Sequence, residues 1–408
     1  MLYNMQDIKN QAMEPVLYLA ELTKLTYTNP FNPLTHTPFG KMMAAGSDVF
    51  GSIYTKREKP EWGIEKALVD GKERAVSVDI IQENPFCNLI HFKRYGCKNR
   101  KDPKVLLVAP MSGHYATLLR GTVKSLIEDH EVYVTDWKDA SLIPLEKGRF
   151  GLDEYMDYLL DYMRLLAPNL SVMAVCQPAP IVLCAVSLLA QQKDPAEPDA
   201  MILMGGPIDT QAAPTIVTTA AENRTMNWFE LNCTHNVPAR FEGANRKVYP
   251  GFLQLRAFMS MNPARHTSAH TKLFNHLIEG DGDSVDAHNK FYDEYMAVMD
   301  VTAEFYLETV EKIFKEHAIP NGTMDWRGEL ITPDAIENCA LMTVEGELDD
   351  ISAPGQTMAT HNLCSNIPTE KHLDLLQENV GHYGIFNGRH WRNTIKPAIG
   401  KFIRANKR

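Results

Sequence analysis

The first candidate for chemistry is a cysteine placed where an expected strand meets an expected helix. Cys176 ends the apolar run Leu170–Cys176, and Gln177-Pro178 after it open a helical segment. A strand, a nucleophile and a helix in this order form the tight turn called a nucleophile elbow, usually written G-x-S-x-G. Here the turn reads AVCQP, with cysteine in place of serine. A buried structural cysteine is the alternative, and the partners of Cys176 decide between the two.

The residues around Cys176 suit such a turn. The strand and helix backbones approach closely at an elbow, so small flanking residues are favoured, and Ala174 meets this need less well than glycine. Pro178 stands where the second glycine is usual. Proline is favoured in the first turn of a helix because its missing N–H is not needed there. The helix N-terminus also stabilises a thiolate at Cys176.

Two further residues follow later expected strands and complete a catalytic set. Asp349 lies in GELDDI after the strand Ala340–Glu347, where a hydrolase triad places its acid. Asp350 is the rival, but the G-x-x-D spacing favours Asp349. His382 follows the last strand in ENVGHYG, whose glycines let a loop fold the histidine over the carboxyl edge of the sheet. The order Cys176, Asp349, His382 is that of the α/β-hydrolases.

Attack on a carbonyl also needs N–H donors for the negative charge that develops on its oxygen. One donor is expected to be the backbone N–H of Gln177, the residue after the nucleophile. The other is expected from the loop after the strand Lys104–Pro110, where Met111 is favoured and Ser112 is the rival. His114 in the same loop could be a third catalytic group, but we expect a hydrogen-bonded histidine that shapes the loop.

These residues require a sheet that brings their strands to one edge. Apolar runs that end in turns alternate with helical segments, which is typical of a parallel sheet covered by helices. We therefore expect an α/β-hydrolase fold: a mostly parallel central sheet with helices on both faces, a helical cap insertion and N-terminal helices. The expected strands are 74–81, 87–95, Lys104–Pro110, Glu131–Trp137, Leu170–Cys176, Ala200–Asp209, Ala340–Glu347 and Lys371–Gln377.

The chain is expected to divide where this strand pattern stops and resumes. The pattern stops near Asp209 and resumes near Ala340, and a long helical stretch, Phe291–His317, lies between. Prolines in TNPFNPLTHTPFG also break the helices before the first strand. The expected segments are an N-terminal helical segment (1–70), the first part of the α/β-hydrolase core (71–210), a cap insertion (211–334) and the second part of the core (335–408).

Composition argues against several classes of protein. The 408 residues include 41 Lys and Arg against 51 Asp and Glu, a net charge of −10, without a long basic run. Because nucleic-acid affinity comes mainly from phosphate neutralisation, we expect no nucleic-acid partner. The apolar run around residues 181–190 is shorter than the roughly 18 residues of a membrane span, so we expect no span. A soluble protein is expected.

Cysteine and histidine usage bears on compartment and cofactors. Seven cysteines occur without a C-x-x-C pair, and the N-terminus lacks a basic region before an apolar stretch. This predicts neither a disulfide framework nor a zinc site and favours the cytoplasm, where a free thiol persists. The fourteen histidines lack H-E-x-x-H spacing, and no Gly-rich nucleotide-binding loop is found. We therefore expect no metal and no cofactor.

The chain also resembles a known family, the intracellular poly(3-hydroxybutyrate) (PHB) depolymerases, over essentially its full length. Taken together the similar stretches are highly specific, although any one alone would not be. The stretch FGSIY at Phe50–Tyr54 departs from the more charged sequence expected there, far from the candidate chemistry. The similar stretches are MLYNMQD, LLVAPMSGHYATLLRGTV, VYVTDWKDA, VMAVCQPA, MGGPIDT, VEGELDDIS and ENVGHYGIFNG.

The resemblance implies a cysteine-based depolymerase that acts on native, amorphous polyester granules in the cytoplasm. The family's cysteine, aspartate and histidine correspond to Cys176, Asp349 and His382. Our hypothesis is that the Cys176 thiolate attacks an ester of the polymer and forms a thioester acyl-enzyme. Its hydrolysis would release 3-hydroxybutyrate monomers or oligomers, and the sequence leaves open whether coenzyme A or a hydroxyl end competes with water as the acyl acceptor. The expected partner is the polymer at the granule surface, and the oligomeric state stays open.

Two other functions remain open from the sequence. A polyhydroxyalkanoate synthase would use the same Cys–Asp–His set, but synthases typically keep glycines around the cysteine, where this chain has Ala174 and Pro178. A non-catalytic granule-binding protein would bind polymer without cleaving it, but it has no need of an elbow thiol. Granule attachment would require an exposed apolar patch, for which the N-terminal helices are one candidate.

Overall fold

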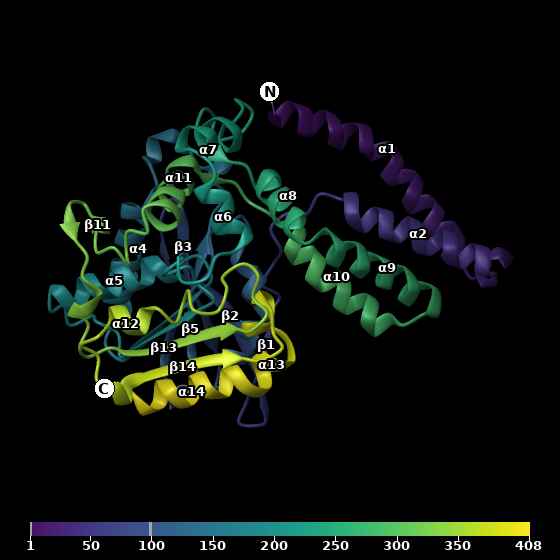
Figure 1. The fold of residues 1–408 in the computed structure, drawn as a ribbon. Helices are drawn as coiled ribbons and strands as arrows, with labels where there is room; N and C mark the ends of the chain where they lie inside the picture. The colour runs from purple at the N-terminus through teal and green to yellow at the C-terminus, as the bar shows by residue number, and fades with distance from the viewer. Residues whose placement is uncertain (1, 98–99) are drawn as a thin grey trace. The chain divides into compact units, whose positions relative to one another are not determined.

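A central sheet of nine strands organises the larger part of this computed structural model, which describes residues 2–97 and 100–408 (Figure 1). In chain order the strands are β1 (Lys66–Val69), β2 (Lys72–Glu83), β3 (Cys87–Arg94), β4 (Lys104–Val108), β5 (Glu131–Trp137), β6 (Leu170–Val175), β7 (Ala200–Met204), β13 (Ala340–Gly346) and β14 (His372–Gln377). Their order across the sheet is β1-β2-β3-β5-β4-β6-β7-β13-β14.

The sheet is antiparallel at one end and parallel through the rest. β1, β2, β3 and β5 pair antiparallel in turn, whereas β5, β4, β6, β7, β13 and β14 pair in parallel. Every residue of β6, β7 and β13 is buried, which is why these strands read as continuous apolar runs. The strand order and the covering helices confirm the expected α/β-hydrolase fold.

Helices cover both faces of the sheet (Figure 1). α5 is buried from Ala179 to Leu189, so the long apolar run in this region is a core helix. α4 buries only one face and begins with acidic residues, which suit a helix N-terminus. The helices are α3 (Arg120–Leu126), α4 (Leu152–Leu166), α5 (Ala179–Gln191), α12 (Thr360–Leu363), α13 (Gly388–His390) and α14 (Lys396–Ala405).

The region between β7 and β13 contains short strands as well as helices. The expected helix Phe291–His317 is wrong as one element, because it is broken at residues 297–302. There the Met299 N–H donates to Gly113 O at 2.7 Å, and Asp300 O accepts from the Ala140 N–H at 3.0 Å. Backbone groups bound to the core cannot also form helical bonds. Apart from the helices of residues 251–296, the elements here are α6 (Ile216–Glu222), α7 (Met226–Cys233), β8 (His235–Asn236), β9 (Lys247–Tyr249), β10 (Val301–Thr302), α11 (Ala303–Thr309), a π-helix (Val310–Lys315), β11 (Asp325–Trp326) and β12 (Glu329–Leu330).

The first strand, β1, was not expected from the sequence. It pairs with β2 through a two-residue turn at Asp70-Gly71, where φ is 50° and 72°. Both residues of such a hairpin turn need positive φ, and Asp-Gly is a strong signal for it. That dipeptide could have revealed β1.

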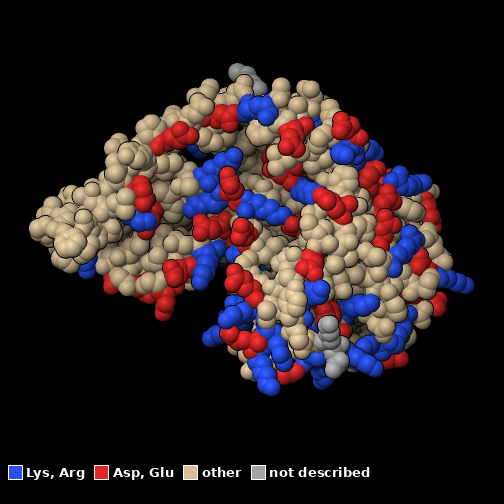
Figure 2. Space-filling model, turned by 180° about the vertical axis from the view of Figure 1, so that it is seen from behind, with Lys and Arg blue, Asp and Glu red and all other residues tan. Residues whose placement is uncertain are grey.

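A second compact unit consists of residues 1–60 and 251–298. Within it α1 packs along α2, α2 along α9, and α9 along α8 and α10. Thr37, Asn262 and Asp281 cap α2, α9 and α10 by accepting a backbone N–H. The surface at the end of α1 and α2, at the left of Figure 2, is mostly neither acidic nor basic. The helices are α1 (Leu2–Thr28), α2 (Pro38–Tyr54), α8 (Gly251–Met261), α9 (Pro263–Glu279) and α10 (Gly282–Met296).

The other unit consists of residues 61–250 and 299–408 and contains the whole central sheet. The N-terminal helices therefore pack with the middle of the expected cap, rather than forming a unit alone. The boundaries expected at residues 70, 210 and 334 stay a prediction. Among the described residues, no helix combines the length and apolar character that crossing a membrane requires.

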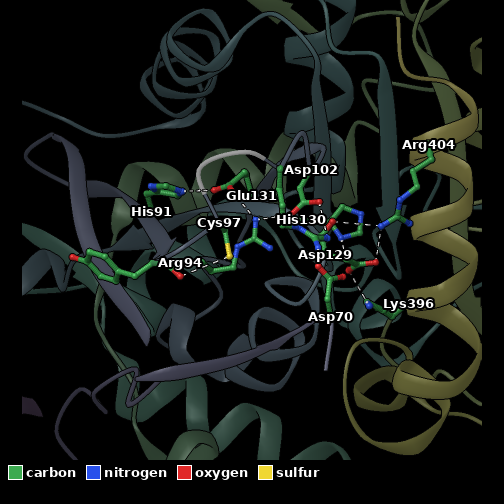
Figure 3. Close-up of polar contacts among 12 residues, drawn as sticks. Asp70, His91, Arg94, Cys97, Asp102, Asp129, His130, Glu131, Lys396 and Arg404 are labelled. Carbon is green, nitrogen blue, oxygen red and sulfur yellow. Dashed lines mark hydrogen bonds and ion pairs between the residues drawn. The ribbon is translucent and has the colours of Figure 1, made fainter. Parts of the chain in front are cut away.

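A network of ion pairs lies at the amino ends of β4 and β5 (Figure 3). The Arg94 guanidinium is fully buried and contacts Asp102 at 2.9 Å and Glu131 at 2.6 Å. Beside it, Asp129 accepts from Lys396 at 2.9 Å and from Arg404 at 2.6 Å, both on α14. These groups lie at the strand ends opposite those that carry the candidate catalytic residues, so we assign them to stability.

Candidate active site

Cys176 lies at a sharp turn between β6 and α5, and its backbone is in the left-handed region with φ of 67°. Its N–H donates to Met204 O at 2.7 Å, and its carbonyl accepts from the Ala179 N–H at 3.1 Å. A non-glycine residue held at such φ stores roughly 1–3 kcal/mol of strain, which the surrounding hydrogen bonds must offset. The turn presents the Cys176 side chain, half-buried, at the carboxyl edge of the sheet.

Two glycines after β7 allow the elbow and the other site residues to approach. A Cβ on Gly206 would lie 2.2 Å from the Ala179 Cβ and 2.9 Å from the Cys176 carbonyl oxygen. A Cβ on Gly205, where φ is +54°, would lie 3.3 Å from Asp349 Oδ2. The site leaves no room for side chains at these positions. Sequence reasoning did not assign them this role, although a Gly-Gly pair directly after a buried strand was a signal for it.

Asp349 lies in the turn that follows β13, and its side chain is fully buried. Its Oδ1 accepts the backbone N–H groups of Ile351 at 2.9 Å and Ser352 at 3.0 Å. These bonds fix the carboxylate and leave Oδ2 to contact His382. The neighbouring Asp350 is exposed.

His382 begins a 3₁₀ turn after β14 and is 4% exposed. Its Nδ1 lies 2.6 Å from Asp349 Oδ2, and the ring is flanked by Tyr383 and Phe386. Cys176 acts on the same ring, and its charge is one of the influences that raise the pKa of His382. The structure thus brings together the three residues that the sequence singled out, from segments far apart in the chain.

The electrostatics of this trio favour an imidazolium. Burial by itself lowers the pKa of His382, but the charges of Cys176 and Asp349 and hydrogen bonds to both outweigh it. The pKa of His382 is consequently held well above its usual value. A protonated imidazole beside the Cys176 sulfur can donate a proton to a departing group.

The expected oxyanion donors, Met111 and Gln177, contact each other. The Met111 N–H donates to the side-chain Oε1 of Gln177 at 3.3 Å. The rival, Ser112, is half-buried, and His114 is buried within the same loop. The Met299 N–H donates to the Gly113 carbonyl at 2.7 Å. Met299, in the region between β7 and β13, therefore fixes the position of the loop that follows β4.

A buried carboxylate that sequence reasoning missed fixes the loop beside Asp349. Glu345, on β13, accepts backbone N–H groups of Gly355 at 2.8 Å, Thr357 at 2.7 Å and Met358 at 3.0 Å. The Thr357 hydroxyl in turn bonds the N–H and carbonyl of Gly206 at 2.8 and 2.9 Å. Glu345 therefore links the acid loop to the glycine that packs against the elbow.

A cavity of about 850 Å³ opens between α6 and the loop that carries Asp349. Its wall is mostly apolar, with hydroxyl, amide and charged groups at intervals. The lining residues are Pro214, Thr215, Ile216, Thr219, Ala220, Asn223, Arg224, Asp349, Asp350 and Ala353.

Comparison with known proteins gives the family of the chain. Residues 205–407, about half of the chain, match the family model described as PHB de-polymerase C-terminus. The chain belongs to the PHB depolymerase family. The matched region begins at the first glycine after β7 and contains Asp349 and His382. Membership of this family makes the protein a carboxylic ester hydrolase.

Solved structures with a similar chain course include three hydrolases. A thermophilic esterase from Thermogutta terrifontis is 13% identical, with 84% of this chain and 98% of that one covered and a TM-score of 0.42. The 2-hydroxy-6-oxo-6-phenylhexa-2,4-dienoate hydrolase of Rhodococcus sp. strain RHA1 is 12% identical (81% and 100% covered, TM-score 0.44). A soluble variant of monoglyceride lipase from Saccharomyces cerevisiae is 11% identical (83% and 98% covered, TM-score 0.45). No curated protein matches the chain.

Proposed function

We propose that this PHB depolymerase family member is an intracellular depolymerase that cleaves polyester bonds of native PHB granules with Cys176 as its nucleophile. The observation that carries the proposal is the trio itself. His382 contacts Asp349 at 2.6 Å, the charge of Cys176 raises the pKa of His382, and Cys176 lies at a strained elbow. A thiol held in this way is suited to acyl transfer.

In the first half of the reaction, the Cys176 thiolate attacks an ester carbonyl of the polymer. The carbonyl becomes a tetrahedral oxyanion, which accepts the Gln177 backbone N–H and a second donor at the Met111–Gln177 contact. The intermediate collapses with cleavage of the C–O ester bond. His382 gives its proton to the departing oxygen, so one polymer fragment leaves with a hydroxyl end and the other is bound to Cys176 as a thioester.

In the second half, water attacks the thioester. His382, now neutral, takes a proton from the water, and the resulting tetrahedral intermediate expels the Cys176 thiolate. The acyl fragment leaves with a carboxyl group, and the thiolate–imidazolium pair is restored. Asp349 holds the ring in one orientation and stabilises its positive charge throughout.

The cavity beside Asp349 is suited to a chain of this kind. PHB repeats an apolar, methyl-bearing segment and an ester group without formal charge. Ile216, Ala220 and Ala353 offer apolar contact, and Thr215 and Thr219 offer hydroxyl donors for ester oxygens. We assign this cavity to the polymer segment next to the scissile ester.

Attachment to the granule is assigned to the N-terminal helices. Single exposed apolar residues are common, but α1 exposes many large ones with only a few charges between them. An amorphous polyester presents an extended, uncharged surface, which such a helix face matches. The exposed residues of α1 are Met5 (58%), Ile8 (65%), Val16 (43%), Tyr18 (66%), Leu19 (61%), Leu22 (41%) and Leu25 (55%).

The experiment that tests the proposal is release of 3-hydroxybutyrate from amorphous PHB granules. Wild-type protein is compared with Cys176→Ala and with Cys184→Ala, a matched control in the buried helix that follows the elbow. We expect no release by Cys176→Ala, normal release by Cys184→Ala, and an acyl group trapped on Cys176 in rapidly quenched wild type. Full release by Cys176→Ala would refute the cysteine mechanism. Polymer formation from 3-hydroxybutyryl-coenzyme A would instead indicate a synthase.

A further inference from the structure

The side chain of Gln177 holds an amide at the position where the oxyanion donors are expected. Its Oε1 accepts the Met111 N–H at 3.3 Å, which is long for such a bond. Its Nε2 is buried and has no hydrogen-bond partner among the described residues. A buried N–H group without a partner is unfavourable by about 1–3 kcal/mol, so it calls for an explanation in a native structure.

The contact with Met111 determines which way the amide faces. A backbone N–H can only donate, so the side chain must present its oxygen to Met111 and its NH₂ away from it. If the amide were rotated by 180°, its NH₂ group would face the Met111 N–H, and two donors cannot form a hydrogen bond with each other. Gln177 directly follows Cys176, and Met111 follows β4, the strand beside β6. The unpartnered NH₂ group therefore belongs to a residue at the same edge of the sheet as the Cys176 thiol.

We propose that Gln177 supplies both oxyanion donors, its backbone N–H and its side-chain Nε2–H, and that the Met111 N–H positions the amide instead of binding the substrate. The inference rests on the proposed thiolate attack. As the ester C=O bond becomes a C–O⁻ bond, the oxyanion accepts the Nε2–H, which otherwise lacks an acceptor. The two hydrogen bonds weaken again when the carbonyl re-forms, and no proton is transferred to or from Gln177.

The same contact has a second interpretation, with the opposite consequence. The Gln177 oxygen could instead occupy the oxyanion site only in the free protein, and substrate would displace it so that the Met111 N–H becomes the donor. Removing the amide would then leave kcat unchanged or raise it. If Gln177 is itself a donor, the same change removes transition-state stabilisation, for which a loss of about 10²–10³ in kcat is usual.

The test uses the full chain with Gln177→Met and Gln177→Leu, two replacements of similar size without an amide. A soluble oligomeric 3-hydroxybutyrate ester serves as substrate, and kcat and KM are measured separately. We expect kcat to fall about 100-fold or more, with KM within about threefold, because the donor acts mainly in the transition state. Alkylation of Cys176 by iodoacetamide forms no oxyanion, so its rate is expected to stay within about twofold of wild type.

A variant whose alkylation rate matches that of wild type has an intact elbow. The kcat of that variant tests the inference. Should kcat in it remain within about tenfold of wild type, the Met111 N–H is the donor and the inference is wrong. Failure of the proposed function has a different signature. Cleavage of the soluble ester without release from granules contradicts the granule substrate alone, and ester cleavage by Cys176→Ala contradicts the nucleophile.

Discussion

Nδ1 of His382 lies 2.6 Å from Oδ2 of Asp349, with both side chains almost completely shielded from water. The two residues follow different strands, β14 and β13, which pair in parallel and end at the same edge. A short contact between buried groups makes the proton on His382 depend strongly on the Asp349 carboxylate. Protonation of His382 should therefore respond to changes at Asp349 far more than to changes at exposed carboxylates nearby.

The first prediction concerns the alkaline limit of activity. Burial lowers the pKa of His382, but Cys176 and Asp349 raise it well above its usual value. The imidazolium that protonates the departing oxygen is thus present below this raised pKa and lost as pH rises through it. Asp349→Asn removes one of the raising charges, so we expect the alkaline limb of kcat to move to lower pH. We also expect activity to fall by about 10³- to 10⁴-fold, as for triad acids elsewhere.

The measurement is a pH profile of ester hydrolysis, with Asp350→Asn as the matched control. Asp350 is the exposed neighbour, so its variant should keep both the rate and the profile of wild type. An unshifted alkaline limb in Asp349→Asn would mean that this carboxylate does not set the protonation of His382.

A second prediction concerns the carboxylate that fixes the acid loop. Glu345→Gln replaces a charged acceptor of three backbone N–H groups by a neutral one that also brings an unneeded NH₂ group. We expect the free energy of unfolding to fall by about 1–3 kcal/mol, measured by urea denaturation. Glu370→Gln, at an exposed position, is the control and should change stability by less than about 0.5 kcal/mol. Equal stability of the two variants would contradict the role given to Glu345.

A third prediction concerns acid stability. Burial raises the pKa of Asp129, but bonds and charges from His130, Lys396 and Arg404 outweigh it and hold that pKa well below its usual value. Stability from a lowered carboxyl pKa is present above the unfolded-state value and is lost as pH falls toward the folded-state value. Asp129→Asn should therefore be less stable than wild type at pH 7, with the difference narrowing below about pH 5. Urea denaturation at several pH values measures the free energy of unfolding of both proteins. A difference between them that does not change with pH would refute the prediction.

A fourth prediction concerns granule attachment. Ile8→Lys, Leu19→Lys and Leu22→Lys combined would place three charges on the exposed apolar face of α1, which an uncharged polyester surface cannot accommodate. We expect co-sedimentation with amorphous granules to drop severalfold, while hydrolysis of a soluble 3-hydroxybutyrate oligomer is unchanged. The control carries Glu14→Lys and Glu21→Lys, at exposed positions on the opposite side of α1. Undiminished sedimentation of the triple variant would exclude α1 as the attachment surface.

Much of the fold could be predicted from the sequence because the central strands are buried on both faces. A strand without a solvent face, such as β6 or β13, reads as an unbroken apolar run, and the alternation of such runs with helices implies a parallel sheet. β1 and the break between α10 and α11 were missed. β1 is short and lies at the edge of the sheet, and the break exists because residues 299–300 bind the core backbone.

The sequence by itself determined the elbow at Cys176 and the candidates Asp349 and His382, because strand order and turn residues are local properties that the chain order preserves. Only the tertiary structure decided what these side chains touch. The approach of Gly205 to Asp349 and the Met111–Gln177 contact join segments that are distant in the chain. Such contacts depend on how strands are placed side by side in the sheet. The spacing of residues along one segment does not predict that placement.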